Sequence, residues 1–138
     1  MTKHAAGTFE VKVSPQPADE ASANSSVGRT LIDKQFRGGL EAASRVQMLG
    51  VRTAVEGSAG YVAMEEVAGA LGGRRGTFVL QHAGTMTRGA LQLSVTVIPD
   101  SGTGELTGLA GRMEINIADG KHSYDFQYTI GEGEPGGE

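Results

Sequence analysis

The chain has 138 residues, a formal net charge of −4 and no cysteine. This length suits one domain with its own hydrophobic core, and the lack of cysteine excludes disulfides, a thiolate nucleophile and a cysteine-ligated metal site. Lysine and arginine are scattered among the acidic residues, so the basic stripe that nucleic-acid binding requires is missing. No apolar run reaches the length of a signal-peptide core or a membrane span, and we therefore expect a cytoplasmic protein.

Alternation of apolar and polar residues is the main pattern along the chain. Between Leu91 and Val97, every second residue is apolar and the intervening ones are polar, which is typical of a strand with one buried face. The 22 glycines, about twice the usual share, fall at turn intervals. Patterns of this kind predict eight strands: Gly7–Ser14, Arg29–Arg37, Leu40–Gly50, Tyr61–Gly69, Thr77–His82, Thr87–Pro99, Arg112–Ala118 and His122–Ile130.

The connections between these strands are mostly short. Gly38–Gly39 and Asp119–Gly120 have the composition of two-residue hairpin turns. The longer connections are a surface loop at 15–27 and a glycine–threonine corner at 100–111, and we expect residues 131–138 to form a flexible tail. An up-and-down order of strands removes its free edges by closing. We therefore predict one all-β domain over residues 1–138, a single eight-stranded antiparallel barrel with its core at about 7–130 and the corner sealing one end.

The segment Leu40–Gly50 is the most ambiguous part of this prediction. Its composition suits a helix, because several of its apolar residues recur near helical spacing. Its position, two glycines after the preceding strand, favours a hairpin partner instead. We predict a strand here, and a helix would overturn the barrel.

Three blocks in the centre of the chain resemble a bacterial family. They are YVAME at 61–65, GRRGTFVLQHAG at 73–84 and SGTGELTGLAG at 101–111. In this order and spacing they are similar to the domain-of-unknown-function family 3224, over about Gly7 to Tyr128. The resemblance implies an eight-stranded barrel of the allene oxide cyclase-like or calycin-like kind, but no reaction, since the family has none assigned. The third block is also similar to a segment of plant dirigent proteins.

Two adjacent carboxylates lie in one predicted strand, and one of them must face its apolar side. Glu65 alternates with Ala63 and Val67, whereas Glu66 alternates with Met64, so the pattern leaves the choice open. The resemblance favours Glu65. An inward carboxylate could act as acid, base or hydrogen-bond anchor, because burial raises its pKa. The equally weighted alternative is an ion pair with an inward cation such as Lys34 or Arg45.

Other polar and aromatic residues are candidates for lining the barrel. His82 ends the apolar row of Phe78 and Leu80, and it is either a ligand contact or general base, or a strand-end histidine bonded to backbone or water. Tyr124 and Tyr128 belong to an aromatic row that either packs the core or forms an apolar wall for a ligand. Lys34 shares an apolar face, where most lysines extend to solvent.

We expect the barrel to bind a small apolar or mixed-polarity molecule. The alternatives are a cofactor-free cyclase or isomerase acting in the cavity, and a structural or interaction protein with a filled barrel. The candidate catalytic residues are Glu65 and His82, and the candidate ligand-binding residues are Tyr61, Glu65, Phe78, His82, Tyr124 and Tyr128. We expect no cofactor, no metal site, no nucleic acid and no membrane as partner, and by analogy with related barrels a homo-oligomer.

Overall fold

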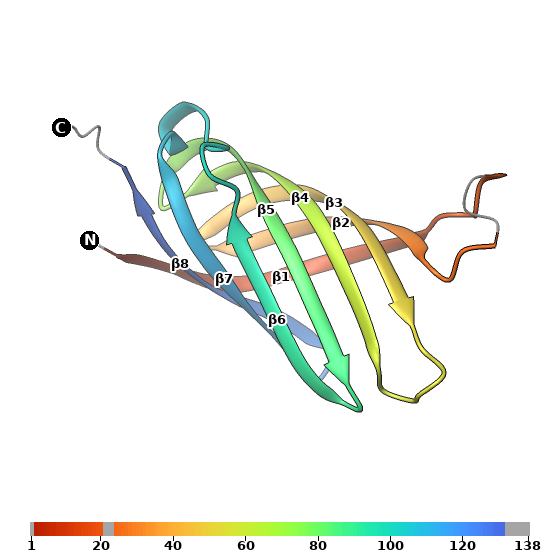
Figure 1. The fold of residues 1–138 in the computed structure, drawn as a ribbon. Helices are drawn as coiled ribbons and strands as arrows, with labels where there is room; N and C mark the ends of the chain where they lie inside the picture. The colour runs from red at the N-terminus through yellow and green to blue at the C-terminus, as the bar shows by residue number, and fades with distance from the viewer. Residues whose placement is uncertain (1, 21–23, 132–138) are drawn as a thin grey trace.

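The computed structural model describes residues 2–20 and 24–131 of the chain. Its eight strands are β1 (Lys3–Pro15), β2 (Gly28–Gly38), β3 (Leu40–Arg52), β4 (Ala59–Leu71), β5 (Arg74–Thr87), β6 (Ala90–Val97), β7 (Leu109–Ala118) and β8 (Lys121–Ile130). Each strand pairs with the next, every pairing is antiparallel, and β8 pairs with β1 to close the barrel (Figure 1). The predicted all-β, eight-stranded antiparallel barrel is therefore confirmed.

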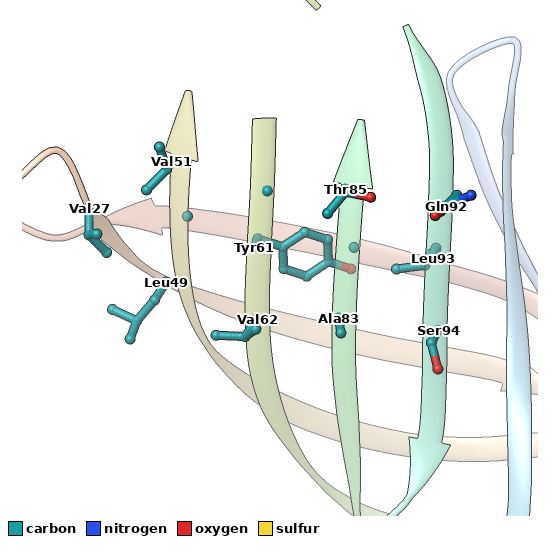
Figure 2. A pocket seen from close by; sticks show the side chains of 13 residues that line it. Val27, Leu49, Val51, Tyr61, Val62, Ala83, Thr85, Gln92, Leu93 and Ser94 are labelled. Carbon is teal, nitrogen blue, oxygen red and sulfur yellow. The ribbon is translucent and has the colours of Figure 1, made fainter. Parts of the chain in front are cut away.

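The ambiguous segment forms strand β3 rather than a helix. From Leu40 to Val46, every second residue is buried and the residues between them are exposed, which is the period of a strand with one face in the barrel. The same alternation continues in β4 and β5. The outward-facing side chains of these strands include Leu49, Val62 and Ala83 (Figure 2).

Several boundaries differ from the sequence-based ones. The prediction of one strand from Thr87 to Pro99 is wrong at its start, since Thr87 ends β5 and the next strand begins at Ala90. Arg88 and Gly89 form the turn, with φ of 46° and 93°, a left-handed conformation that an arginine rarely adopts and therefore does not signal. β1 ends at Pro15, which is the first residue of the predicted surface loop. Residues 21–23 of that loop lie outside the described residues. The predicted tail lies outside them as well, apart from Gly131.

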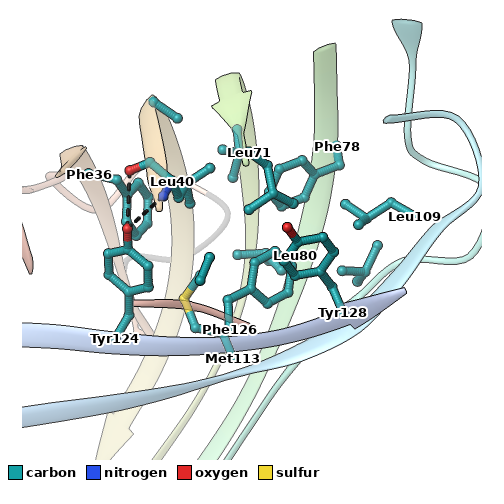
Figure 3. Packing of buried hydrophobic residues seen from close by; sticks show 14 of the residues in the cluster. Phe36, Leu40, Leu71, Phe78, Leu80, Leu109, Met113, Tyr124, Phe126 and Tyr128 are labelled. Atoms are coloured by element: carbon teal, nitrogen blue, oxygen red, sulfur yellow. Dashed lines mark hydrogen bonds between the residues drawn. The ribbon is translucent and has the colours of Figure 1, made fainter. Parts of the chain in front are cut away.

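One end of the barrel is packed solid. Its core consists of aromatic and aliphatic side chains from all eight strands and from the 3₁₀ turn η2 (Gly104–Leu106), ten of which Figure 3 labels. Leu106 is fully buried, and the segment before it is held by hydrogen bonds from Thr103 N to Thr77 O (2.8 Å) and from Val79 N to Ser101 Oγ (3.0 Å). The glycine–threonine corner therefore seals this end.

The opposite end is open. Val13, Leu91 and Ile117 occupy inward-facing positions of their strands, yet they are 54%, 58% and 67% exposed. Among the described residues, a single pair, Thr96 with Arg112, joins β6 to β7, so the strands separate toward this end. Apolar side chains that face inward and still reach water indicate a hollow, and we call this end the mouth.

Tyr124 fastens the packed end. Its hydroxyl accepts a hydrogen bond from Leu40 N (2.9 Å) and lies 2.9 Å from Arg37 O and 3.1 Å from Leu40 O, to which it donates (Figure 3). The bonds tie β8 to the hairpin between β2 and β3, where Gly38 has a φ of 110°. Tyr128 is also buried, but no hydrogen bond joins its hydroxyl to any described residue.

The two tyrosines form a matched pair for a test of stability. We expect Tyr124→Phe to lower the free energy of unfolding by about 1–3 kcal/mol, because it leaves the buried Leu40 N–H without a partner. Tyr128→Phe should change it by less than about 1 kcal/mol, since no such partner is lost. Urea unfolding of both variants measures the difference. A larger loss for Tyr128→Phe would contradict the assigned role of Tyr124.

Candidate functional site

The structure settles which of the two adjacent carboxylates faces the barrel interior. Glu65 is 0% exposed and shares its face with Ala63 and Val67, whereas Glu66 is exposed on the outer surface. The sequence pattern left this choice open, and only the closed barrel decides it.

Three donors from three neighbouring strands surround the Glu65 carboxylate. Oε1 accepts hydrogen bonds from Lys34 Nζ (3.2 Å, β2) and His82 Nε2 (2.7 Å, β5), and Oε2 accepts one from Ser44 Oγ (2.6 Å, β3). Lys34 and His82 are themselves only 8% and 3% exposed. We call Lys34, Ser44, Tyr61, Glu65 and His82 the Glu65 cluster.

These contacts keep Glu65 ionised. Burial alone raises the pKa of a carboxyl, but the hydrogen bond from His82, the charge of Lys34 and the hydrogen bond from Ser44 together outweigh it, so the pKa of Glu65 lies below its ordinary value. Lys34 Nζ also lies 4.8 Å from the centre of the Phe9 ring, a cation–π contact. The alternative cation, Arg45, pairs with Asp33 on the outside at 3.3 Å, so the inward partner is Lys34.

Tyr61 extends the cluster toward the mouth. Its hydroxyl lies 3.1 Å from His82 Nδ1. Because a carboxylate only accepts, His82 Nε2 carries the hydrogen of the bond to Glu65, and Nδ1 is the atom that contacts the Tyr61 hydroxyl. Burial, followed by the negative charge of Glu65, raises the pKa of Tyr61 to about 12. Gly84 makes room for the ring, since a Cβ there would lie 2.7 Å from Tyr61 Cε1.

Tyr61 also lines a cavity inside the mouth. This mouth cavity has a volume of about 360 Å³. Its lining residues come from β2 to β6 and from the ends of those strands: Gly28, Thr30, Met48, Gly50, Val51, Arg52, Ala59, Gly60, Tyr61, Gly84, Thr85, Met86 and Leu91. Arg52 carries the single full charge among them. The buried His82 and Glu65 connect to this cavity through Tyr61.

Of the sequence-predicted site residues, three come together and three lie elsewhere. Tyr61, Glu65 and His82 form the hydrogen-bonded chain described above. Phe78, Tyr124 and Tyr128 lie in the core of the packed end, and none of them lines the mouth cavity. Phe78 stacks on Phe126 with ring centres 5.8 Å apart. Their place in the core matches the packing interpretation of the aromatic row.

Several residues of the site were not among the candidates predicted from the sequence. Ser44 lies between Ala42 and Val46 on the buried face of β3, and a polar residue in that row was a usable signal. The sequence contains no such signal for Thr30, Met48 and Arg52. These residues line the mouth cavity only because the packed core does not extend to that end of the barrel.

A larger hollow lies on the outer surface of the barrel. It measures about 720 Å³, is lined by outward-facing side chains such as Leu49, Val62 and Ser94, and shares Tyr61 with the mouth cavity (Figure 2). None of its lining residues carries a carboxylate, an imidazole or a cationic group. Tyr61 is the only member of the Glu65 cluster in this outer groove, whereas the mouth cavity combines Tyr61 with the charge of Arg52, so we take the smaller mouth cavity as the candidate site.

Two kinds of feature are absent from the described residues. No three histidine, aspartate or glutamate side chains there gather as a metal site requires. None of the described residues belongs to a helix that is long and apolar enough to cross a membrane.

These features define a closed eight-stranded antiparallel barrel with one packed end, one open end and a buried carboxylate between them. The family model described as protein of unknown function (DUF3224) matches residues 5–128, and the chain therefore belongs to the DUF3224 family. It is similar to a solved crystal structure of a DUF3224-family protein with unknown function from Shewanella oneidensis MR-1, at 48% identity and a TM-score of 0.87, covering 96% of this chain and 100% of that one. No curated protein matches the chain.

A double-mutant cycle tests the buried ion pair. We expect Lys34→Met to lower the free energy of unfolding by about 3–5 kcal/mol, because it leaves the Glu65 charge buried without its cation. Adding Glu65→Gln should restore part of the loss, with a coupling energy of at least about 1 kcal/mol in urea unfolding. The matched control is the exposed pair, where Arg45→Met with Asp33→Asn should show a coupling of about 0–1 kcal/mol. Equal coupling energies for the two pairs would contradict the inference that burial strengthens the interaction between Lys34 and Glu65.

The raised pKa of Tyr61 predicts a loss of stability at alkaline pH. In the unfolded chain the phenol ionises near its ordinary pKa of 10.0, whereas folded Tyr61 keeps its proton to about 12. Its contribution to stability is therefore complete below pH 10 and is lost as the pH rises toward 12. We expect Tyr61→Phe to flatten this part of the stability profile in urea unfolding. An unchanged alkaline profile would show that Tyr61 does not titrate as assigned.

Proposed function

We propose that the protein binds a small, largely apolar molecule in the mouth cavity, with a polar group of that molecule at Tyr61. The observation that carries the proposal concerns Tyr61. It lines the cavity, and its hydroxyl is also the last group of a hydrogen-bonded chain that runs through His82 to Glu65. Sites for small molecules combine mostly apolar walls with a few positioned polar groups.

The exposed apolar side chains of the mouth support this proposal. Leu91 and Met86 line the cavity, and Val13 of β1 and Ile117 of β7, which are not among its lining residues, occupy inward positions and are exposed. An occupant that covers such surface gains about 25 cal/mol per Å² of apolar area removed from water. Arg52 supplies a cation at the same cavity, which suits a ligand with an oxygen or an acidic group in addition to its apolar body.

The packed end limits where a ligand is placed. In a structural or interaction protein with a filled barrel, side chains would fill the interior from one end to the other. Here the packed side chains reach as far as the Glu65 cluster, and the mouth cavity lies beyond it. We therefore assign the ligand to the mouth alone, and Phe78, Tyr124 and Tyr128 take no part in the proposed contact. That the chain forms a homo-oligomer stays a prediction.

Binding of an apolar fluorescent probe tests the proposal. Anilinonaphthalene sulfonate combines aromatic rings with an anionic group, and we expect its emission to rise on binding in the mouth. Thr30→Trp, which fills the cavity, should weaken this binding at least about ten-fold, equivalent to about 1.4 kcal/mol. Ala83→Trp places the same bulk in the outer groove and is the matched control, with urea unfolding of both variants to establish that they fold.

Two results would overturn the proposal. If Ala83→Trp abolishes probe binding while Thr30→Trp leaves it intact, the ligand belongs to the outer groove. If the wild-type protein does not bind the probe, and native mass spectrometry of protein purified from its source finds no retained small molecule, the mouth cavity is not a ligand site.

A further inference from the structure

We propose that Tyr61, His82 and Glu65 form a proton relay, and that the barrel is an isomerase for apolar carbonyl compounds. The reaction moves a proton from one carbon to another within a ketone or enone. This inference rests on the proposed function, because the substrate is the molecule bound in the mouth cavity. It goes beyond that function by assigning the bound molecule a chemical class and a reaction.

The hydrogen bonds of the cluster have one consistent direction. Glu65 is ionised and only accepts, so Lys34, Ser44 and His82 all donate to it. In the proposed resting state His82 is neutral, with its proton on Nε2, so the electron pair on Nδ1 accepts the Tyr61 proton across the 3.1 Å contact. The Tyr61 oxygen keeps a lone pair with which it can accept a proton from a molecule in the cavity. The order carboxylate, imidazole, hydroxyl is the one by which enzymes activate a hydroxyl group.

The proton transfer balances without a further reactant. A C–H bond next to the substrate carbonyl breaks, and its proton passes to Tyr61 Oη while the Tyr61 proton passes to His82 Nδ1. The electron pair of that bond becomes part of the enolate, and the imidazolium lies against the Glu65 carboxylate. Return of both protons along the same path places a hydrogen on another carbon of the enolate. Nothing is oxidised or reduced, and Tyr61 and His82 end as they began.

Glu65 itself is not the base. Its carboxylate is 0% exposed, both its oxygens are occupied by donors, and it is separated from the mouth cavity by His82 and Tyr61. It is a positioning residue that fixes the imidazole in one tautomer and balances the charge the imidazole acquires. Lys34 keeps Glu65 ionised in turn. Tyr61 is the catalytic residue, because it is the member of the chain that lines the cavity.

The cavity also contains groups for the carbonyl oxygen. Arg52 is the one fully charged side chain among its lining residues, and Thr30 offers a hydroxyl. Negative charge develops on the substrate oxygen as the enolate forms, and a cation or hydroxyl donor near that oxygen stabilises it. The remaining walls, among them Met48, Met86 and Leu91, suit an apolar body. An apolar ketone therefore fits the cavity better than a sugar or a nucleotide.

Hydrogen–deuterium exchange of β-tetralone, an apolar ketone, tests the relay. In deuterated buffer, we expect the wild-type protein to accelerate exchange of the protons next to the carbonyl, followed by NMR. Tyr61→Phe should lose about 100-fold or more of this acceleration, the scale of general acid–base catalysis, while β-tetralone still binds in saturation-transfer NMR. Tyr128→Phe makes the same chemical change in the packed core and should keep the acceleration.

The outcomes separate the relay from ligand binding. If β-tetralone binds and exchange is not accelerated, or is equally fast in Tyr61→Phe, the relay is wrong and the binding function stands. If β-tetralone does not bind but anilinonaphthalene sulfonate does, the carbonyl class is wrong and the binding function again stands. If neither molecule binds to the wild-type protein, the proposed function fails and the relay fails with it.

Discussion

A carboxylate without access to water constrains this barrel more than any other group. Burying an ionised Glu65 costs several kcal/mol unless donors replace the lost water, and Lys34, Ser44 and His82 do so from three different strands. A shift of one residue in the pairing of β2, β3, β4 or β5 would turn one of these groups outward. Lys34 pairs with Ser44 across β2 and β3, and His82 pairs with Ala63 across β4 and β5, so the observed register brings all of them to Glu65.

The Glu65 cluster lies between two halves of different character. On one side, the side chains around Phe126 fill the barrel completely, and Tyr124 and Leu106 hold that end together. On the other side, Gly84 makes room for the Tyr61 ring, and inward-facing apolar side chains stay exposed. The packed half supplies the rigidity that keeps the cluster in place, and the hollow half supplies access. A charged group therefore lies where the packed core meets the hollow mouth.

Much of the fold could be predicted from sequence, because strands with one buried face leave a period of two. The position of Leu40–Gly50, two glycines after the preceding strand, predicted β3 against a helical composition, and hairpin turns such as Asp119–Gly120 indicated the order of strands. The site could be predicted only in part. Tyr61, Phe78 and Tyr128 have the same inward pattern, and nothing in the pattern distinguishes a cavity wall from a core residue. That distinction depends on which end the 100–111 segment closes, a property of the assembled barrel.

The seam between β6 and β7 has a mechanical consequence. Thr96 and Arg112 form its one residue pair, whereas every other seam in the described barrel has at least seven. Separating these two strands near the mouth breaks almost no backbone ladder, so it costs far less than opening any other seam. The circumference of the open half can consequently grow while the filled half keeps its shape. For the proposed ligand, this seam would be an entrance at the side of the barrel that requires no strand to unfold.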